Sequence, residues 1–311
     1  GRLQSVGAVD PDPAKAGRPL AGFWGGQGGP VVKASLKEAL AEAGGVDIAF
    51  HCAGSHLSQI EGQLLELLDA GCNVVTTAEE VIWPYGPRDE AAGRLDAAAR
   101  RNGVTLFAAG VNPGFLLDRL PTYLSSMTLG PTAVRGTRLV DLSKRRNALR
   151  RKMGVGEDAA AVRARTATFA MGHAGFPESV RYVAAALGWE VGEVVQHLEP
   201  VVADRKVERA GEVVLPGQVL GLAHTARAVS RDGKEISWEM TTIIREPNQA
   251  METELTGWGL TVRNFTRIAV LENQRKDRNG VLVDSVRSGG PTAESKPALR
   301  ADDIVTRVGR K

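Results

Sequence analysis

The sequence has little of several residue classes, and each shortage excludes a class of protein. Only two cysteines, Cys52 and Cys72, occur among its 311 residues, so no disulfide framework organises the fold and reduced thiols are expected. No apolar run reaches the length that spans a bilayer, and the first residues do not have the form of a signal peptide. The formal net charge is only +3 and the basic residues are spread along the chain, which does not indicate nucleic-acid binding. These absences predict a cytoplasmic protein.

The first part of the chain has the pattern of an α/β domain. Apolar residues make up 43% and charged residues 24% of the sequence, as is ordinary for globular proteins. Short apolar runs alternate with helical patterns, which indicates a doubly wound parallel sheet of the Rossmann-like kind over residues 1–130. Its first strand and glycine-rich turn are expected to be missing, because the sequence begins directly in a strand pattern that ends at Asp10. Strands are expected at 5–10, 46–52, 73–77 and 104–109, and helices at 35–43 (capped by Ser35), 56–70 and 89–101.

After residue 130 the alternation gives way to blocks of strands and helices. This change predicts an α+β substrate or dimerisation domain over residues 131–247. Arg231-Asp232-Gly233 indicates a hairpin between its last two strands. A polar linker then leads to a small β module over residues 250–311. Strands are expected at 134–141, 212–214, 219–229, 235–244, 260–262, 280–286 and 303–308, and helices at 157–170 and 177–187.

Polar segments follow two strands of the first domain. The loop Gly110-Val111-Asn112-Pro113-Gly114-Phe115 follows one strand, and the pair Glu79-Glu80 follows another. Asn, Pro and Gly predict a tight loop with exposed N–H groups before a helix that starts at Phe115. Because loops at the carboxyl ends of parallel strands converge, we expect the loop and the acidic pair to face one pocket. A glutamate beside the Trp83-Pro84-Tyr85 stretch can be partly desolvated, which suits a proton acceptor or an ammonium-binding group; the alternative is that both glutamates flank a helix in solvent.

Further residues are candidates for binding a cofactor or a substrate. Asp10 could accept the ribose hydroxyls of NAD and repel a 2′-phosphate, or it could belong to a simple Asp-Pro turn. Ala53, Gly54 and Ser55 suit close approach of a cofactor, and Ser55 could instead cap the next helix. His173, in the loop Gly172–Ser179, could donate to a substrate carboxylate or be structural. The basic cluster at 144–152 could bind a carboxylate or cofactor phosphates, or form a solvated face. The histidines lack metal-ligand spacing, so no metal site is expected.

Six motifs occur in order between Val6 and Ile244. With them the chain resembles the native amine dehydrogenases, the group around 2,4-diaminopentanoate dehydrogenase, whose first domain is like that of dihydrodipicolinate reductase. The resemblance ends at Ile244, so the closing segment of the family is expected to be missing. The motifs are Gly7-Ala8-Val9-Asp10, Thr77-Ala78-Glu79-Glu80, Gly110 to Phe115, Gly172 to Ser179, Leu187-Gly188-Trp189 and Pro216-Gly217-Gln218.

The resemblance implies NAD(P)-dependent oxidative deamination of a small amine or amino acid, or the reverse reductive amination. It implies that one of Glu79 and Glu80 holds the ammonia or amine, and that Asn112, with Pro113 and Gly114, lies against the nicotinamide. A carboxylate there would stabilise the cationic nitrogen that forms during hydride transfer. NAD is the expected cofactor and NADP the alternative.

The last segment resembles part of a PDZ domain of the kind found in HtrA-like proteases. Gly257-Trp258-Gly259-Leu260 matches the loop whose backbone N–H groups bind the carboxylate of a peptide C-terminus. The stretch from Ser288 to Ile304 matches the helix and strand that follow, although Asp302 stands where that pattern usually has Gly. The resemblance implies a partial peptide-binding module.

Two other functions are open from the sequence. One is a peptide-binding module fused to an inactive dehydrogenase scaffold. The other is a dihydrodipicolinate-type reductase, which would need a cationic His/Lys site for a dicarboxylate. The expected partners are a small amine or ketone and a peptide C-terminus, and a homodimer through the second domain's sheet is usual for such folds. No nucleic-acid or membrane partner is expected.

Overall fold

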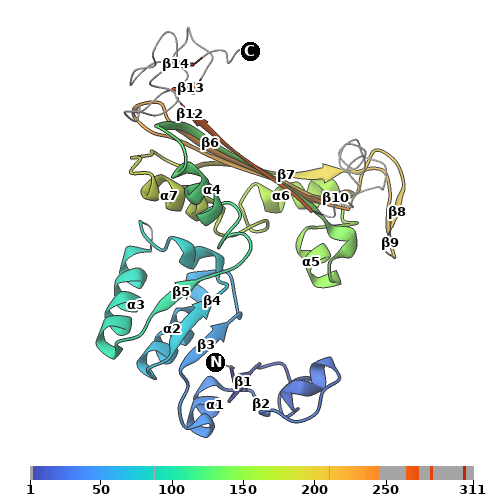
Figure 1. The fold of residues 1–311 in the computed structure, drawn as a ribbon. Coiled ribbons are helices and arrows are strands. Elements are labelled where there is room, and N and C mark those ends of the chain that lie inside the picture. The colour runs from blue at the N-terminus through green and yellow to red at the C-terminus, as the bar shows by residue number, and fades with distance from the viewer. Residues whose placement is uncertain are drawn as a thin grey trace, which may run out of the picture.

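The structure, a computed structural model, describes residues 3–86, 88–209, 211–244, 264–272, 281–282 and 304–305. Figure 1 shows that residues 8–108 form a lower part, and that a long sheet with its helices forms an upper part. No helix within the described ranges combines the length and the apolar character that crossing a bilayer requires.

The lower part contains two parallel sheets. One pairs β1 (Ala8–Val9) with β2 (Val32–Lys33), and the other has the order β3 (Ile48–His51), β4 (Asn73–Thr76) and β5 (Leu106–Ala108). Between the strands lie η1 (Leu20–Trp24), α1 (Leu36–Ala43), α2 (Leu57–Asp69), η2 (Glu79–Ile82) and α3 (Asp89–Asn102). The mixed α/β fold with parallel sheets that the sequence predicted is confirmed.

Helix ends in the lower part follow capping chemistry. The Ser35 side chain accepts from the Glu38 N–H at 3.5 Å and begins α1 as predicted. Gly103 ends helix α3. It adopts φ = 66°, a left-handed conformation that glycine allows without steric cost. The predicted cap of α2 is wrong, because His56 rather than Ser55 occupies the N-cap position. A carboxylate oxygen of Glu80 instead accepts from the Leu57 N–H at 2.7 Å.

The upper part is a five-stranded mixed sheet covered by helices. The strand order is β12-β6-β11-β10-β7, in which only β6 and β11 are parallel neighbours. The elements are α4 (Arg119–Ser125), β6 (Pro131–Asp141), η3 (Leu142–Lys144), α5 (Asn147–Lys152), α6 (Ala159–Thr166), α7 (Phe176–Ala186), β7 (Val195–Val202), β8 (Val207–Arg209), β9 (Glu212–Val214), β10 (Val219–Val229), β11 (Glu235–Ile243) and β12 (Asn264–Glu272).

Two strands of this sheet test the sequence analysis directly. The predicted hairpin is confirmed, since β10 and β11 pair antiparallel with Val229 opposite Glu235. β7 was not predicted. It carries Pro200, which an edge strand tolerates because it pairs on one side only.

β12 differs from the expected domain division. Asn264–Glu272 was placed in a separate module that begins at residue 250, but β12 pairs antiparallel with β6 along its whole length. Its partner lies far away in the sequence, and local composition does not reveal such pairing. Two short strands that follow, β13 (Val281–Leu282) and β14 (Ile304–Val305), pair antiparallel. The other features expected for the PDZ-like segment, among them Gly257, Trp258, Gly259 and Leu260, lie outside the described residues.

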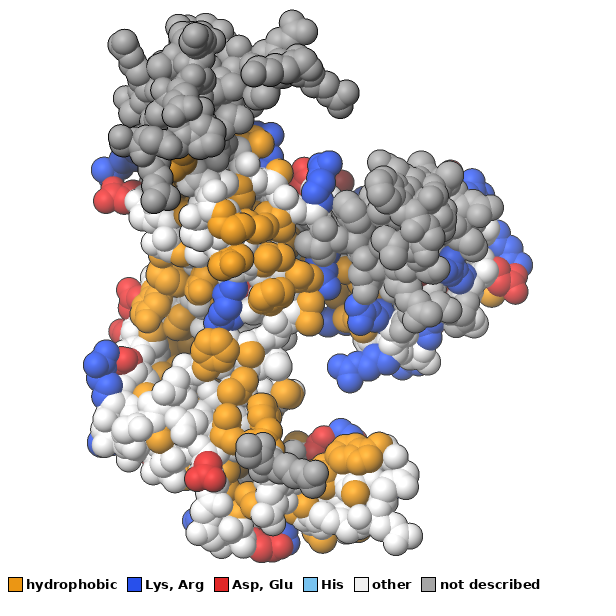
Figure 2. All heavy atoms as spheres, viewed as in Figure 1, with side chains coloured by type: hydrophobic (Ala, Val, Ile, Leu, Met, Phe, Trp, Pro, Cys, Tyr) orange, Lys and Arg blue, Asp and Glu red, His pale blue; other side chains and the backbone are white. Residues whose placement is uncertain are grey.

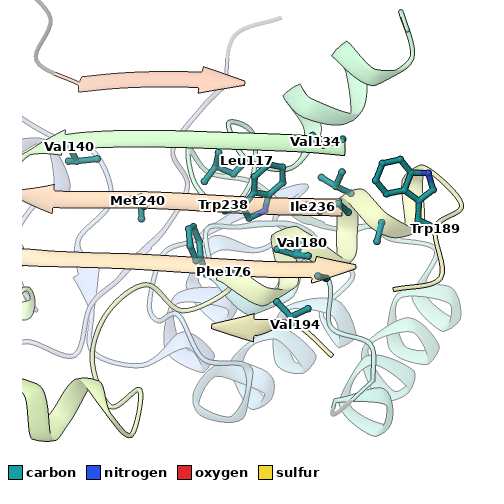
Figure 3. Packing of buried hydrophobic residues seen from close by; sticks show 14 residues of the cluster. Leu117, Val134, Val140, Phe176, Val180, Trp189, Val194, Ile236, Trp238 and Met240 are labelled. Atoms are coloured by element: carbon teal, nitrogen blue, oxygen red, sulfur yellow. The ribbon is translucent and has the colours of Figure 1, made fainter. Parts of the chain in front are cut away.

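The core of the upper part lies between α7 and one face of the sheet. Trp238 of β11 is fully buried, and Phe176 and Val180 of α7 belong to the same cluster (Figure 3). Trp238 lies opposite Gly136 of β6, where a Cβ would come within 2.8 Å of the indole ring. Side chains two residues apart share a face of a sheet, so Met240 lies on the same face as Trp238 and belongs to the same cluster. The candidate active site begins there.

Candidate active site

The carboxyl ends of the parallel strands carry most of the predicted cofactor residues. Asp10 follows β1, Ala53-Gly54-Ser55 follows β3, and Asn112-Pro113-Gly114 lies in the loop after β5. Strands β3, β4 and β5 lie side by side, so their loops share one edge. The Glu80 N–H donates to the Ser55 carbonyl at 3.2 Å, which joins the loops after β3 and β4.

Asp10 is ionised and held in place. Its carboxylate forms an ion pair with Lys15 at 2.5 Å and accepts from the Asp12 N–H at 3.0 Å. The hydrogen bond from Lys15, followed by that of Asp12, lowers the pKa of Asp10 below its ordinary value. Its role toward a ribose stays a prediction.

The loop after β5 folds back on itself in a way that requires glycine. Gly114 has φ = 128°, and a Cβ there would lie 2.4 Å from the Gly110 nitrogen. The Gly114 N–H donates to the buried Asp118 carboxylate at 2.7 Å, and Arg119 donates to the Ala108 carbonyl at 2.8 Å. Turns occupy the stretch between the loop and α4, so the helix starts at Arg119 and not at Phe115 as predicted.

Asn112 presents an unused acceptor. Its side-chain nitrogen lies 3.6 Å from the Met240 sulfur, on the sheet of the upper part. Its Oδ1 atom is buried and has no hydrogen-bond partner among the described residues. A buried polar atom without a partner is costly unless a ligand supplies one. A carboxamide N–H of a nicotinamide would supply a donor, so the loop fits the predicted cofactor.

The two glutamates of η2 have different surroundings. Glu80 accepts from the Leu57 N–H and from His56 Nδ1 at 3.0 Å. It also accepts from Arg88 Nη2 at 2.6 Å and from Arg88 Nε at 3.0 Å. Burial opposes ionisation, but these hydrogen bonds together hold the pKa of Glu80 below its ordinary value. Glu80 is therefore a charged structural residue whose acceptor sites are occupied.

Glu79 has the properties of a reactive carboxylate. Its Oε2 atom is buried without a hydrogen-bond partner in the described part of the chain. Burial raises the pKa of Glu79 above its ordinary value, and Lys152, Ser55, His56 and Ala174 only partly offset the effect. Neighbouring carboxyl groups whose pKa values move apart have different roles. This separation identifies Glu79 as the candidate for binding a proton or an ammonium group.

A polar row crosses the sheet beside the apolar core. Arg138 of β6, Met240 of β11 and His224 of β10 lie opposite one another in register, so they share a face. Arg138 is buried, and its Nε and Nη1 atoms have no hydrogen-bond partner among the residues that the structure describes. Burial, then repulsion from Arg145, lowers the pKa of Arg138, yet a guanidinium stays charged at physiological pH. A buried guanidinium with free donors has the chemistry to bind an anion such as a carboxylate.

Two neutral histidines lie at one end of this row, His224 within it and His173 beside His224. His173 Nε2 lies 3.2 Å from the Thr242 hydroxyl, and burial, with repulsion from His224, Lys152 and Arg138, lowers its pKa from 6.5 to about 3. Burial lowers the pKa of His224 from 6.5 to about 4, and its Nε2 atom lies 3.1 Å from the Gln196 side chain. The rings of His173 and His224 stack with their centres 6.4 Å apart. The sequence pointed to His173 but missed Arg138 and His224, which belong to no motif.

The buried histidines predict a pH dependence of stability. The unfolded chain takes up a proton at His224 below pH 6.5, whereas the folded protein does so only near pH 4. The free energy of unfolding is therefore expected to fall between these values, by up to about 3 kcal/mol from this residue. Urea unfolding of His224→Gln should show a weaker loss toward acid than the unaltered protein, while the exposed His197→Gln should not differ from it. Equal pH slopes for all three proteins would contradict the assignment.

A hollow lies between the two parts of the molecule. Figure 2 shows a hollow between the β1–β2 region below and Lys and Arg side chains above, where Figure 1 places α5. Lys152, at the end of α5, acts electrostatically on both Glu79 and His173, so part of the predicted basic cluster faces the site. No group of His, Cys, Asp and Glu side chains within the described ranges could hold a metal ion.

Comparisons with known proteins agree with this fold. Residues 115–274 match the family of the 2,4-diaminopentanoate dehydrogenase C-terminal domain. The 2,4-diaminopentanoate dehydrogenase of Acetoanaerobium sticklandii is 26% identical over 196 residues, which are 62% of this chain and 55% of that protein. The chain thus spans about half the length of this relative. The structure of an amine dehydrogenase from Mycobacterium smegmatis matches with a TM-score of 0.69 and 25% identity, over 79% of this chain and 73% of that one.

The α/β fold is similar to that of a solved amine dehydrogenase. The chain belongs to the family of the 2,4-diaminopentanoate dehydrogenase C-terminal domain, whose match covers half of it. The family match runs to residue 274 and includes β12. The expectation that the resemblance to the family ends at Ile244 was therefore wrong. The comparisons favour neither the peptide-binding alternative nor the dihydrodipicolinate-type reductase.

Proposed function

We propose that the protein is an NAD(P)-dependent oxidoreductase that deaminates a small amine to a ketone and ammonia, or catalyses the reverse reaction. The observation that carries the proposal is the contrast within η2, where Glu80 is fully engaged and Glu79 keeps a buried free oxygen. The family and the amine dehydrogenase of similar fold support it.

The residues of the chain have distinct parts in this reaction. When bound, the nicotinamide accepts the hydride of the amine-bearing carbon. Asn112 would hold its carboxamide through the free Oδ1 atom, and Asp10 and the Ala53–Ser55 loop would hold the adenosine side. Glu79 would stabilise the cationic nitrogen, as the substrate passes from amine to iminium, and would take up the proton that the nitrogen loses. Water then adds to the iminium carbon, and ammonia leaves.

The substrate that fits best carries an anionic group as well as the amine. Arg138 is buried with free donors, and the neighbouring His224 keeps a buried Nδ1 atom without a partner in the described structure. His173 lies within electrostatic range of Arg138, and Gly175, two residues further on, packs against the Glu79 backbone. The anion site and the carboxylate therefore belong to one pocket. An amino acid or amino carboxylate would satisfy both ends of it.

The proposal is tested with matched pairs of amines that differ only in a terminal carboxylate. The protein is mixed with NAD⁺ or NADP⁺ and each amine, and the near-ultraviolet absorbance of the reduced nicotinamide is followed together with released ammonia. We expect equal amounts of reduced cofactor and ammonia, and a lower KM for the amine with the carboxylate. Cofactor binding without reduction by any amine, or reduction by alcohols instead, would overturn the proposal.

Partners and location follow from the same interpretation. The small-molecule partner would be the amine or ketone, the setting the cytoplasm, and a second copy would pair through the sheet of the upper part. The sheet face opposite the site carries Thr137, Thr225 and Thr241, which a dimer could cover. A peptide C-terminus at Gly257–Leu260 stays a separate prediction, which peptide titration against the whole chain would test.

A further inference from the structure

We propose that Arg88 is a positioning residue that fixes Glu79 by tying η2 to the first turn of α7. This inference rests on the proposed role of Glu79. Arg88 lies just ahead of α3 and matches none of the motifs in the sequence.

The guanidinium of Arg88 reaches two elements at once. Its Nε and Nη2 atoms donate to the two carboxylate oxygens of Glu80 at 3.0 and 2.6 Å, the side-on geometry that arginine forms and lysine does not. Its remaining terminal nitrogen donates to Glu178 of α7 at 2.8 Å. Glu80 and Glu178 are 8% and 3% exposed, so water does not replace Arg88 as their partner. One side chain thus joins the lower part of the molecule to the upper part.

Glu79 lies between the two ends of this connection. On one side it is followed directly by Glu80. On the other side Gly175, the residue before α7, packs so closely that a Cβ would lie 2.5 Å from the Glu79 carbonyl oxygen. The backbone of Ala174, the residue before Gly175, favours the ionised form of the Glu79 carboxyl group and so counteracts the rise in its pKa. The position of α7 relative to η2 therefore determines where the Glu79 side chain sits.

Aromatic contacts mark the same junction. Trp83, which follows η2, meets Tyr182 of α7 edge-on with ring centres 6.4 Å apart. This edge-to-face arrangement is one that aromatic pairs favour, so the two parts are packed against each other at this junction. The three charge-assisted hydrogen bonds of Arg88 are directional, and they select one arrangement.

Removing the Arg88 guanidinium is expected to change the pKa of Glu79, which the loss of a purely structural residue would not do. Glu80, the residue next to Glu79, would lose the guanidinium that balances its charge, and Glu178 would keep only its longer ion pair with Arg181 at 3.7 Å. Lys152 would remain as a cation that acts on Glu79, while the adjacent Glu80 would carry a negative charge that Arg88 no longer balances. Additional unpaired negative charge disfavours ionisation of Glu79, so the pKa of Glu79 would rise further. Displacement and protonation both reduce turnover, and neither weakens cofactor binding.

The experiment compares Arg88→Gln, Arg88→Lys and Glu178→Gln with a control, Arg94→Gln. The control removes an exposed arginine that pairs with Glu61 at 2.6 Å on the surface of the same domain. For Arg88→Gln we expect kcat for the amine to fall by about 10–100-fold with an unchanged Kd for NAD⁺, and the acid limb of the pH–rate profile to move to higher pH. Arg88→Lys keeps the positive charge, so the acid limb of its pH–rate profile should lie near the native position. Its kcat should nevertheless stay below the native value, because lysine does not form the side-on pair with Glu80. Glu178→Gln should lower kcat and leave the limb near its native position.

The outcomes separate this inference from the proposed function. The inference is overturned if Arg88→Gln and Glu178→Gln both fold and both show the native kcat and the native acid limb of the pH–rate profile. If Arg88→Gln does not fold, Arg88→Lys and Glu178→Gln decide by the same criterion. If Glu79→Gln retains activity, the proposed function fails. In that case carbon NMR titration of the Glu79 carboxyl in the Arg88 variants still tests the positioning, because it needs no turnover.

Discussion

Replacing Glu79 by glutamine is expected to lower kcat for amine oxidation by about 10²–10⁴-fold, the range that general acid–base groups contribute. Glutamine keeps the shape of the side chain, but it neither accepts a proton nor balances a cationic nitrogen. The Kd for NAD⁺, measured by calorimetry, should not change, because Asn112 and the loops after β1 and β3 remain. Turnover of Glu79→Gln at the native rate would exclude the carboxylate from the chemistry.

Glu80→Gln is the matched comparison, since it makes the same change at the adjacent position. Glutamine cannot balance Arg88, and it offers one acceptor oxygen where four hydrogen bonds now end. Breaking a buried ion pair costs about 3–5 kcal/mol, so the free energy of unfolding should fall by roughly this amount. Glu79→Gln removes a carboxylate whose ionisation burial already disfavours, and its stability should be native or higher. A loss of stability in Glu79→Gln and of turnover alone in Glu80→Gln would reverse the two roles.

Local sequence signals were enough for the elements of the lower part. α2 buries Leu57, Ile60, Leu64 and Leu68 at helical spacing, and glycines in left-handed conformations end α1 and α3. These signals act within a few residues, and a sequence shows them. β12 depends on pairing with β6 across more than a hundred residues of chain, and no pattern inside Asn264–Glu272 specifies that partner.

The same limit explains what the sequence showed of the site. Glu79, Glu80 and Asn112 follow parallel strands, and the geometry of such sheets brings their loops together. The sequence alone did not show which of the two glutamates is the reactive one. The difference arises because Arg88 and the Leu57 N–H engage Glu80. Arg138 and His224 each look like an ordinary polar residue in a strand. Only the register of β6, β11 and β10 places them beside Met240 and Asn112.

Arg138 determines the substrate class in this interpretation. Replacing it by methionine keeps a long side chain and removes the charge. Hydrogen bonds to a charged group contribute about 1.5–3 kcal/mol, so KM for an amine with a carboxylate should rise by about 10–100-fold. KM for the matched neutral amine should stay the same or fall, because the pocket becomes apolar.

Stability provides the second readout for Arg138. A buried guanidinium whose Nε and Nη1 atoms have no partner among the described residues is destabilising in the unliganded protein. Arg138→Met should therefore raise the free energy of unfolding by about 1–4 kcal/mol while it weakens binding of the anionic amine.

The control is Arg135→Met on the same strand, since Arg135 is exposed and pairs with Glu235 at 3.3 Å. This control variant should change KM for neither amine. If Arg138 served only in packing, its replacement would lower the free energy of unfolding and would affect KM for both amines equally. A variant that is more stable but binds the anionic amine more weakly would show that Arg138 is a binding residue and not a packing residue.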